Sequence, residues 1–364
     1  MSRATPASTA RFAARHPSAD FFRPGWDGLN LASVGLGTYL GEPDAATDAR
    51  YAAAIRRYLA LGGNVIDSAI NYRFQRSERA IGEALAAALR AGDVTREEVV
   101  VCTKGGYLSF DGDWPADPDG WVRETFIDTG LVRPEEIVEG HCMTPAYLRH
   151  QIAQSLKNLQ AECIDLYYLH NPESQRAVVG EMEFRARLRE AFAALEVAVA
   201  QGHIAAYGTA TWNGYRAPPH APDYLSLQTV LEVARDVMGG QHHFRAVQLP
   251  FNFQMVEALG MRNQPGANGL QSFLKVAADN GVTVIASASL LQSRLVGRLP
   301  DALRARFDGC TTDAQRALQF VRSTPGLATA LAGMSRVEHV EENMQLIRLA
   351  PMTAHDHRAL FDTS

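Results

Sequence analysis

The sequence predicts an α/β protein with a (β/α)8 TIM barrel fold. Short apolar runs alternate strictly with longer amphipathic patterns, and there are eight of each. Strict alternation implies parallel strands joined by helical crossovers, and eight such units close into a barrel. No GxGxxG motif follows the first run. That absence argues against the open, doubly wound sheet of a dinucleotide-binding domain.

The expected strands are near-continuous apolar runs with β-branched residues, which is typical of strands covered on both faces. They span residues 31–38, 64–69, 99–106, 164–170, 205–212, 245–252, 282–289 and 327–334. The expected helices span residues 48–63, 77–92, 144–159, 184–202, 226–240, 269–281, 311–323 and 336–348. Ser77 is a plausible N-cap of the second helix, and Gly92 is its expected end.

Two long loops interrupt the repeat after strands three and five, at residues 107–143 and 212–223. Long ordered loops in compact domains are usually functional. No linker divides the chain, so we expect residues 26–364 to form one barrel domain, preceded by a disordered tail over residues 1–25. That Arg-, Ser- and Ala-rich segment also has some features of an organelle transit segment, but it lacks a clear amphipathic face.

Charge and composition exclude several classes of partner. The net charge is −5 and no Lys/Arg run forms a basic patch, so nucleic acid is not an expected partner. No apolar stretch reaches the roughly 18 residues that a membrane span needs. The four cysteines form no CxxC pair, as expected for reduced thiols in a cytoplasmic protein. No heptad repeat or exposed apolar stripe predicts an oligomeric state.

Four side chains with acid–base chemistry stand at or just beyond strand ends: Asp67, Tyr72, Lys104 and His170. The C-terminal strand ends of such a barrel form the active site. A free phenol has a pKa of about 10, and a nearby ammonium lowers it. The carboxylate would hold the lysine charged, and the histidine would bond the substrate oxygen. Each residue alone has a structural interpretation, such as a strand cap or a core histidine, but the four together favour a proton donor for a carbonyl oxygen.

A metal site is not expected. His141 and Cys142 lie close together in sequence and would combine with His170 and Asp67 as ligands. No HxH or HExxH spacing supports that combination.

The sequence resembles the aldo-keto reductases over roughly residues 30 to 348. The matching pieces are GLGTY, NVIDSAINY, SERAIGEAL, TKGG, SLKNLQAECIDLYYLHNPE and HVEENMQLI. The resemblance implies a (β/α)8 barrel that reduces aldehydes and ketones with NADPH, or runs the reverse oxidation, with Tyr72 as the acid. It also implies that the nicotinamide lies across the barrel mouth and the adenine end lies by strands seven and eight.

The resemblance further implies a set of cofactor-binding residues, in which NADP(H) is favoured and NAD(H) is an alternative. Thr211 stands where the family usually has Asn, and Ser287 stands where it usually has a Tyr that stacks on the nicotinamide. Trp212 either replaces that stack or fills core. Arg336 is one step away from the usual phosphate-binding position. The full set is Gly37, Thr38, Tyr39, Thr211, Gln248, Ser287, Leu290, Gln292, Gly333, Ser335, Arg336, His339, Glu342 and Asn343.

Aromatic side chains on loops are the candidate substrate wall, and they suit a sugar or another small carbonyl compound. The candidates are Tyr39, Phe74, Trp114, His141 and Trp212. Two other functions stay open. One is a non-redox barrel enzyme that performs an elimination or isomerisation with the same Tyr/Lys pair. The other is a cofactor-sensing regulatory subunit.

Overall fold

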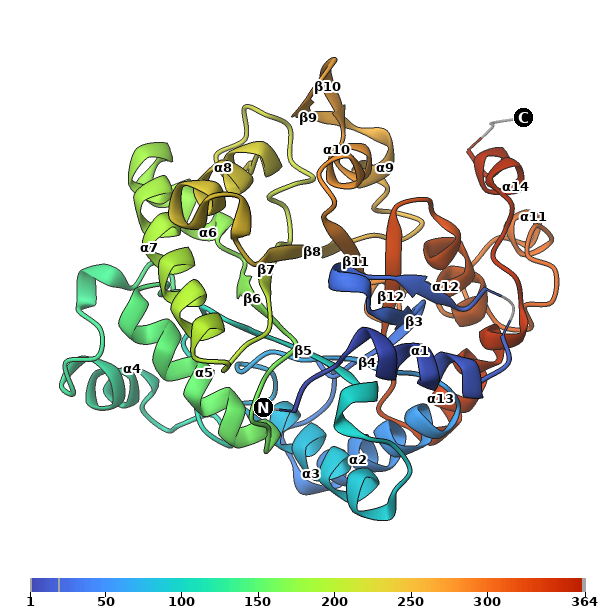
Figure 1. The fold of residues 1–364 in the computed structure, drawn as a ribbon, viewed down its shortest axis with the longest axis horizontal. Helices are drawn as coiled ribbons and strands as arrows, with labels where there is room; N and C mark the ends of the chain where they lie inside the picture. The colour runs from blue at the N-terminus through green and yellow to red at the C-terminus, as the bar shows by residue number, and fades with distance from the viewer. Residues whose placement is uncertain (1, 19, 362–364) are drawn as a thin grey trace.

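Eight parallel strands close into a barrel in the computed structural model, which describes residues 2–18 and 20–361 (Figure 1). The strands are β3 (Val34–Gly37), β4 (Val65–Asp67), β5 (Val100–Gly105), β6 (Leu166–His170), β7 (Tyr207–Ala210), β8 (Phe244–Pro250), β11 (Thr283–Ser287) and β12 (Leu327–Gly333). They follow one another around the barrel in chain order, and β12 pairs with β3 to close it. All eight expected strands are present, and the predicted (β/α)8 TIM barrel is confirmed.

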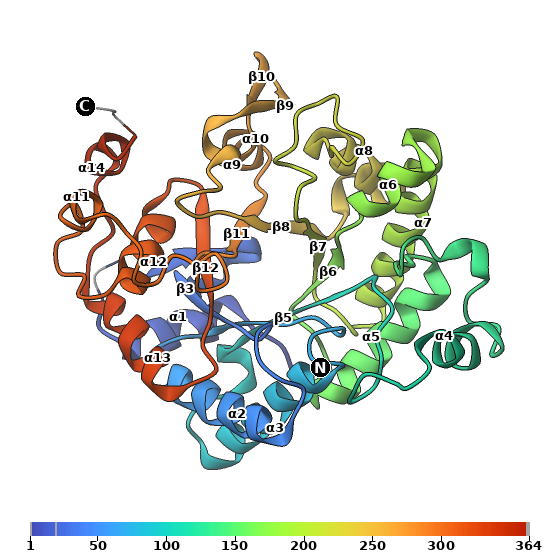
Figure 2. The ribbon, with the colours of Figure 1, turned by 180° about the vertical axis from the view of Figure 1, so that it is seen from behind.

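The helices that follow the barrel strands form a ring around the sheet (Figures 1 and 2). The main ones are α2 (Ala45–Ala60), α3 (Arg76–Ala91), α5 (Pro145–Leu159), α7 (Glu181–Ala200), α8 (Leu227–Met238), α10 (Phe273–Asp279), α12 (Asp313–Ser323) and α13 (Val337–Asn343). Shorter helices accompany them: α4 (Pro118–Val122), α6 (Glu173–Val179), α9 (Glu257–Gly260), α11 (Asp301–Arg304) and α14 (Ala354–Ala359). Each expected helix therefore has a counterpart after the expected strand.

The described residues of the N-terminal segment, 2–18 and 20–25, include a helix and a strand, contrary to the expectation of a disordered tail over residues 1–25. Helix α1 (Pro6–Arg15) buries Phe12, and strand β1 (Phe22–Pro24) pairs antiparallel with β2 (Asn30–Ala32). The backbone N–H of Ala4 donates to the Asp165 carboxylate at 2.6 Å. Helix α1 lies on the near side of the barrel in Figure 1 and behind it in Figure 2. Apolar anchoring and a buried hydrogen bond thus order the segment that composition alone marked as a tail.

Two helix boundaries differ from expectation for local reasons. Helix α3 ends at Gly92 in a left-handed conformation, as expected, but Gln75 and not Ser77 is its N-cap. The Ser77 hydroxyl donates instead to the backbone oxygen of Thr38 at 2.7 Å. Residues 269–272 form strand β10 (Gly269–Ser272), paired with β9 (Arg262–Gly266), so helix α10 begins later than its periodic pattern indicated.

The long segment after β5 has structure of its own. It contains α4, a π-helical turn over Arg123–Ile127 and a separate small core. That core consists of Phe126, Val132, Cys142 and Tyr147. The segment is therefore a packed insertion between β5 and α5, beside the mouth of the barrel.

Strand register brings the functional positions to one end of the barrel. Gly37 pairs with Asp67, and Ala210 lies between His170 and Gln248. All of these residues lie at or near the C-terminal ends of their strands. The side chains selected from the sequence therefore come from neighbouring strands at the same mouth.

Candidate active site

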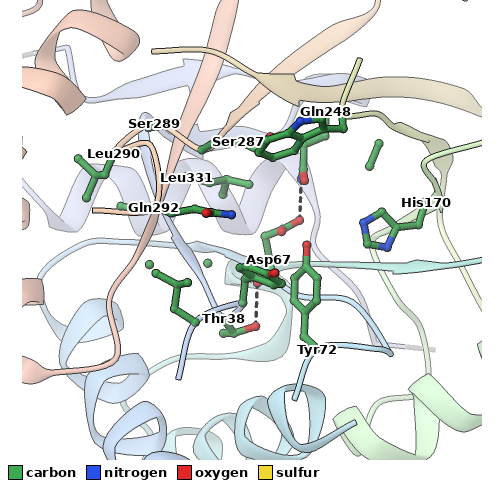
Figure 3. A pocket seen from close by; sticks show the side chains of 18 of the residues that line it. Thr38, Asp67, Tyr72, His170, Gln248, Ser287, Ser289, Leu290, Gln292 and Leu331 are labelled. Atoms are coloured by element: carbon green, nitrogen blue, oxygen red, sulfur yellow. Dashed lines mark hydrogen bonds between the residues drawn. The ribbon is translucent and has the colours of Figure 1, made fainter. Parts of the chain in front are cut away.

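The C-terminal end of the barrel holds a cavity of about 430 Å³ (Figure 3). In this view Ser289, Leu290 and Gln292 lie on one side and His170 on the other, with Asp67 and Tyr72 between them. The lining residues are Gly37, Thr38, Tyr39, Leu40, Asp67, Asn71, Tyr72, Tyr107, His170, Asn171, Ala210, Thr211, Trp212, Gln248, Ser287, Ala288, Ser289, Leu290, Gln292, Ser293, Leu331, Ala332 and Gly333.

Asp67 and Lys104 form a buried ion pair at the base of the cavity. The Lys104 Nζ donates to Asp67 Oδ2 at 2.5 Å and to the backbone oxygen of Ser68 at 2.7 Å. The other carboxylate oxygen accepts from the Gln248 amide at 2.8 Å. Burial is the largest single effect and lowers the pKa of Lys104, but the Asp67 carboxylate and Tyr72 together outweigh it, so the net pKa is raised. Lys104 is therefore an ammonium at neutral pH.

Tyr72 lies next to this ammonium and faces the cavity. The Lys104 Nζ is 4.9 Å from the centre of the Tyr72 ring, and the Tyr39 ring packs edge-on against Tyr72 at 4.9 Å. Burial raises the pKa of the Tyr72 hydroxyl, while the Lys104 ammonium acts in the opposite direction. The expected lowering by the lysine is thus present, but burial is the larger effect. Tyr72 carries its proton throughout the neutral range.

A left-handed turn directly after Tyr72 sets the direction in which the chain continues from the tyrosine. Arg73, Phe74 and Gln75 all have positive φ angles of 49°, 56° and 71°. Non-glycine residues pay a conformational cost there of order 1–3 kcal/mol each. The buried guanidinium of Arg73 offsets part of it by donating to the Asp48 carboxylate and, at 2.9 Å, to the backbone oxygen of Glu42.

His170 is neutral and faces the cavity beside Tyr72. The two rings lie 5.9 Å apart. Burial, the Lys104 ammonium and His141 all lower the pKa of His170 well below its ordinary value. Its Nδ1 is buried without a hydrogen-bond partner among the described residues. A neutral imidazole in this position can bond a substrate oxygen without competing with Tyr72 as the acid.

His141 is not on the cavity wall, in contrast to the expectation that it contacts substrate. Its side chain is fully buried, and its Nε2 donates to the backbone oxygen of His170 at 2.7 Å. Its Nδ1 accepts from the Gln175 amide at 3.0 Å, which fits a neutral ring. Burial lowers the pKa of His141 to about 4. His141 therefore fixes the end of β6 that carries His170.

The cofactor-binding residues expected from the resemblance separate into two groups. One group lines the cavity: Gly37, Thr38, Tyr39, Thr211, Gln248, Ser287, Leu290, Gln292 and Gly333. The other group lies along α13 and in the two residues before it, outside the cavity wall: Ser335, Arg336, His339, Glu342 and Asn343. Glu342 accepts from the Thr312 hydroxyl at 2.6 Å, so it is engaged with helix α12.

Two buried polar atoms fit a bound dinucleotide. The Thr211 hydroxyl lines the cavity, and the Asn343 side-chain oxygen lies at the end of α13; both lack a hydrogen-bond partner among residues 2–18 and 20–361. A buried polar group without a partner costs free energy, so such atoms often mark ligand contacts. Gln248, by contrast, already donates to Asp67. The residues present thus fit a ligand with polar groups at both places, as the expected dinucleotide has.

The aromatic substrate candidates also separate. Tyr39 and Trp212 line the cavity and are 54% and 41% exposed. Phe74 and Trp114 instead pack on each other and on Phe110, with ring centres 5.0–6.1 Å apart, outside the cavity wall.

Several wall residues were not expected from the sequence, and Tyr107 and Asn171 are the most informative of them. The Tyr107 ring lies 5.1 Å from that of His170, and its hydroxyl accepts from Asn171 at 3.2 Å. Each follows a strand end directly, Tyr107 after the TKGG run and Asn171 after His170. Both residues could have been predicted from the sequence, because each directly follows a strand that carries a candidate catalytic residue.

This geometry is accompanied by a clear family assignment. The family model described as Aldo/keto reductase family matches residues 33–362. The chain belongs to the aldo/keto reductase family. The resemblance read from the sequence is thereby confirmed, and the family is one of oxidoreductases.

Curated relatives of this aldo/keto reductase have low sequence identity to it but match most of its length. A putative aryl-alcohol dehydrogenase of Saccharomyces cerevisiae is 24% identical over 311 residues, covering 80% of this chain and 71% of the relative. An uncharacterized oxidoreductase of Bacillus subtilis is 23% identical over 345 residues, covering 92% and 94%.

Solved structures with similarly low sequence identity share the fold. An aldo/keto reductase from Klebsiella pneumoniae, in complex with NADP and acetate, superposes with a TM-score of 0.59 at 22% identity, covering 93% of this chain and 94% of that one. An aldo-keto reductase from Bacillus halodurans in its holo form gives a TM-score of 0.62 at 20% identity, covering 93% and 95%.

The described residues contain neither a membrane-spanning helix nor a metal-ligand cluster. None of the helices in residues 2–18 and 20–361 combines the length and apolarity needed to cross a membrane. Over the same residues, no three His, Cys, Asp or Glu side chains form a group that could hold a metal ion.

Proposed function

We propose that this protein is a nicotinamide-dependent oxidoreductase that interconverts a small carbonyl compound and its alcohol, with Tyr72 as the proton donor in reduction. The observation that carries the proposal is the arrangement of Lys104 between the Asp67 carboxylate and the Tyr72 ring at the base of the cavity. A charged, desolvated ammonium beside a phenol stabilises the phenolate that forms when the proton leaves.

The side chains divide the chemistry between them. When bound, the nicotinamide would supply the hydride equivalent at the carbonyl carbon. Tyr72 donates its proton to the carbonyl oxygen, and Lys104 stabilises the resulting phenolate. Neutral His170 orients the same oxygen by a hydrogen bond, and Asp67 keeps Lys104 charged and in place.

The cofactor contacts follow from the unpartnered atoms and the aromatic wall. Thr211 would bond the nicotinamide amide through its free hydroxyl, and Trp212 would supply the aromatic contact that Ser287 lacks. We favour NADP(H), with NAD(H) as the alternative, because relatives from Klebsiella pneumoniae are complexed with NADP and NADPH. Arg336, the N-cap of α13, is the Arg or Lys that most closely precedes Asn343 in the sequence.

The substrate class is a small carbonyl compound, alcohol or sugar. The cavity of about 430 Å³ accommodates a small molecule, and Tyr39, Tyr107 and Trp212 give it aromatic walls. The aryl-alcohol dehydrogenase description of the yeast relative supports a substrate of this size and chemistry.

A titration of the cofactor-stripped protein with NADPH and NADH, followed by tryptophan emission, tests the proposal. Saturable binding of either cofactor, followed by its oxidation on addition of an aldehyde, is the expected result. Binding without turnover across a panel of aldehydes, ketones and sugars would favour a cofactor-sensing role, and no binding would favour non-redox chemistry.

A further inference from the structure

A buried carboxylate holds the loop that leaves β7. Glu173 begins helix α6, and its side chain is 4% exposed. Its Oε1 accepts backbone N–H groups from Trp212 at 2.6 Å, Asn213 at 3.2 Å and Gly214 at 3.5 Å. The same loop places Thr211 and Trp212 in the cavity wall. One oxygen atom thus sets the path of the chain on this side of the cavity.

In the described residues, the side chain of Glu173 accepts its hydrogen bonds from backbone N–H groups. Its second oxygen, Oε2, is buried without a hydrogen-bond partner in the described part of the chain. Burial raises the pKa of the Tyr107 hydroxyl on the loop after β5 and of the Tyr215 hydroxyl on the loop after β7, and the charge of Glu173 adds to both rises. Burial raises the pKa of Glu173 to about 7, and the backbone N–H of Glu173 itself, together with the N–H groups of the loop, partly counteracts burial.

We propose that ionised Glu173 is a positioning residue that holds Thr211 and Trp212 in the arrangement that binds the nicotinamide cofactor. This inference rests on the proposed function. A hydrogen bond to a charged carboxylate is roughly twice as strong as one to a neutral acceptor. Protonation therefore weakens all three bonds to the loop together. Cofactor affinity falls as the pH falls through the titration of Glu173.

The test variant is Glu173→Gln, which keeps the shape of the side chain but cannot ionise. Its matched control is Glu98→Gln, because Glu98 is also buried and also accepts a backbone N–H, from Thr95 at 3.0 Å, but precedes β5 at the opposite end of the barrel. NADH is used beside NADPH since it lacks the 2′-phosphate, whose own titration near about pH 6 would otherwise contribute. Thermal unfolding of each variant verifies that it is folded.

The wild type and Glu173→Gln are expected to differ in pH dependence as well as in affinity. Between about pH 8 and about pH 6, a group that titrates near 7 changes from about nine-tenths to about one-tenth ionised, so the wild-type Kd should rise up to about tenfold. Glu98→Gln should follow the wild type. Glu173→Gln should bind weakly at both pH values. Wild-type affinity and wild-type pH dependence in Glu173→Gln would overturn the proposal.

A second measurement needs no variant of Glu173. The emission of Trp212, obtained as the difference between the wild type and Trp212→Phe, is expected to titrate in the free protein over the same pH range. A flat Trp212 emission would overturn the proposal even if Glu173→Gln failed to fold. Failure of the wild type to bind either cofactor would contradict the proposed function instead, and the emission titration would still decide whether Glu173 controls the loop.

Discussion

Lys104 Nζ lies 2.5 Å from Asp67 Oδ2 and 4.9 Å from the centre of the Tyr72 ring. The ammonium is thus shared between a carboxylate that keeps it charged and a phenol whose ionisation it assists. Burial raises the pKa of the Tyr72 hydroxyl, and Lys104 is the main effect that opposes burial. The predictions about acid–base behaviour follow from this relationship.

Replacing Lys104 by Met should shift alcohol oxidation to higher pH and lower turnover. Oxidation needs Tyr72 as the phenolate, and loss of the ammonium raises the pKa of Tyr72 further. General acid–base catalysis contributes roughly 10²–10⁴-fold, so a loss in that range is expected. The measurement is the pH dependence of kcat for oxidation. Lys104→Arg keeps the charge and should shift the profile less. An unshifted profile in Lys104→Met would contradict the proposal that Lys104 assists the ionisation of Tyr72.

Replacing Trp212 by Ala should weaken cofactor binding if its indole supplies the aromatic contact that Ser287 cannot. Aromatic contacts are worth about 0.5–1.5 kcal/mol beyond area, equivalent to roughly two- to twelvefold in Kd. The measurement is equilibrium titration with NADPH. Trp114→Ala is the control, because Trp114 is exposed and lies outside the cavity wall. Equal affinities of the two variants would show that Trp212 contributes no such contact.

His141→Gln should make the free energy of unfolding fall less steeply as the pH is lowered. The folded-state pKa of His141, about 4, lies below the ordinary value of 6.5, so the unfolded chain binds the proton first. Its contribution to the free energy of unfolding is present above pH 6.5 and is lost as pH falls toward 4, by up to about 1.4 kcal/mol per pH unit. Denaturant unfolding at several pH values measures the slope.

Glutamine replaces the imidazole N–H with an amide donor for the His170 oxygen but does not titrate. Unfolding of His141→Gln should therefore bind up to one proton fewer in acid, and the slope of its stability against pH should be smaller. His203→Gln changes an exposed histidine and should keep the wild-type slope. Identical slopes for all three proteins would mean that His141 does not titrate as its burial implies.

Arg73→Ala should destabilise the turn that follows Tyr72. The substitution removes partly buried hydrogen bonds to Asp48 and Glu42 and leaves a left-handed non-glycine residue. A loss of about 1–3 kcal/mol in the free energy of unfolding is expected. Arg79→Ala removes a more exposed ion pair to Asp111 and should cost at most about 1 kcal/mol. Chemical denaturation compares them, and equal costs would contradict an anchoring role for Arg73.

The sequence was sufficient for the barrel and the four catalytic candidates because both depend on strand ends. Each of Asp67, Lys104 and His170 stands at the end of an apolar run that only a buried strand explains, and parallel closure brings such ends together. The path of the chain away from the strands was harder to predict. His141 and Trp114 lie in the segment 107–143, whose separate core turns one toward His170 and the other toward solvent.

Backbone conformation and buried polar contacts were also beyond sequence patterns. The positive φ angles at Arg73, Phe74 and Gln75 occur without any glycine to indicate them. The N-terminal helix depends on the packing of Phe12 and on a hydrogen bond from Ala4 to a residue 161 positions away. Long-range contacts of this kind leave no local periodicity in the chain.

The most direct test of the central claim is a single-turnover experiment with Tyr72→Phe and the wild type, each loaded with NADPH and mixed with a panel of aldehydes. We expect the wild type to oxidise one NADPH per aldehyde reduced. Tyr72→Phe should bind NADPH as tightly but react roughly 10²–10⁴-fold more slowly, since only the proton donor is lost. Equal single-turnover rates for the two proteins would contradict Tyr72 as the acid.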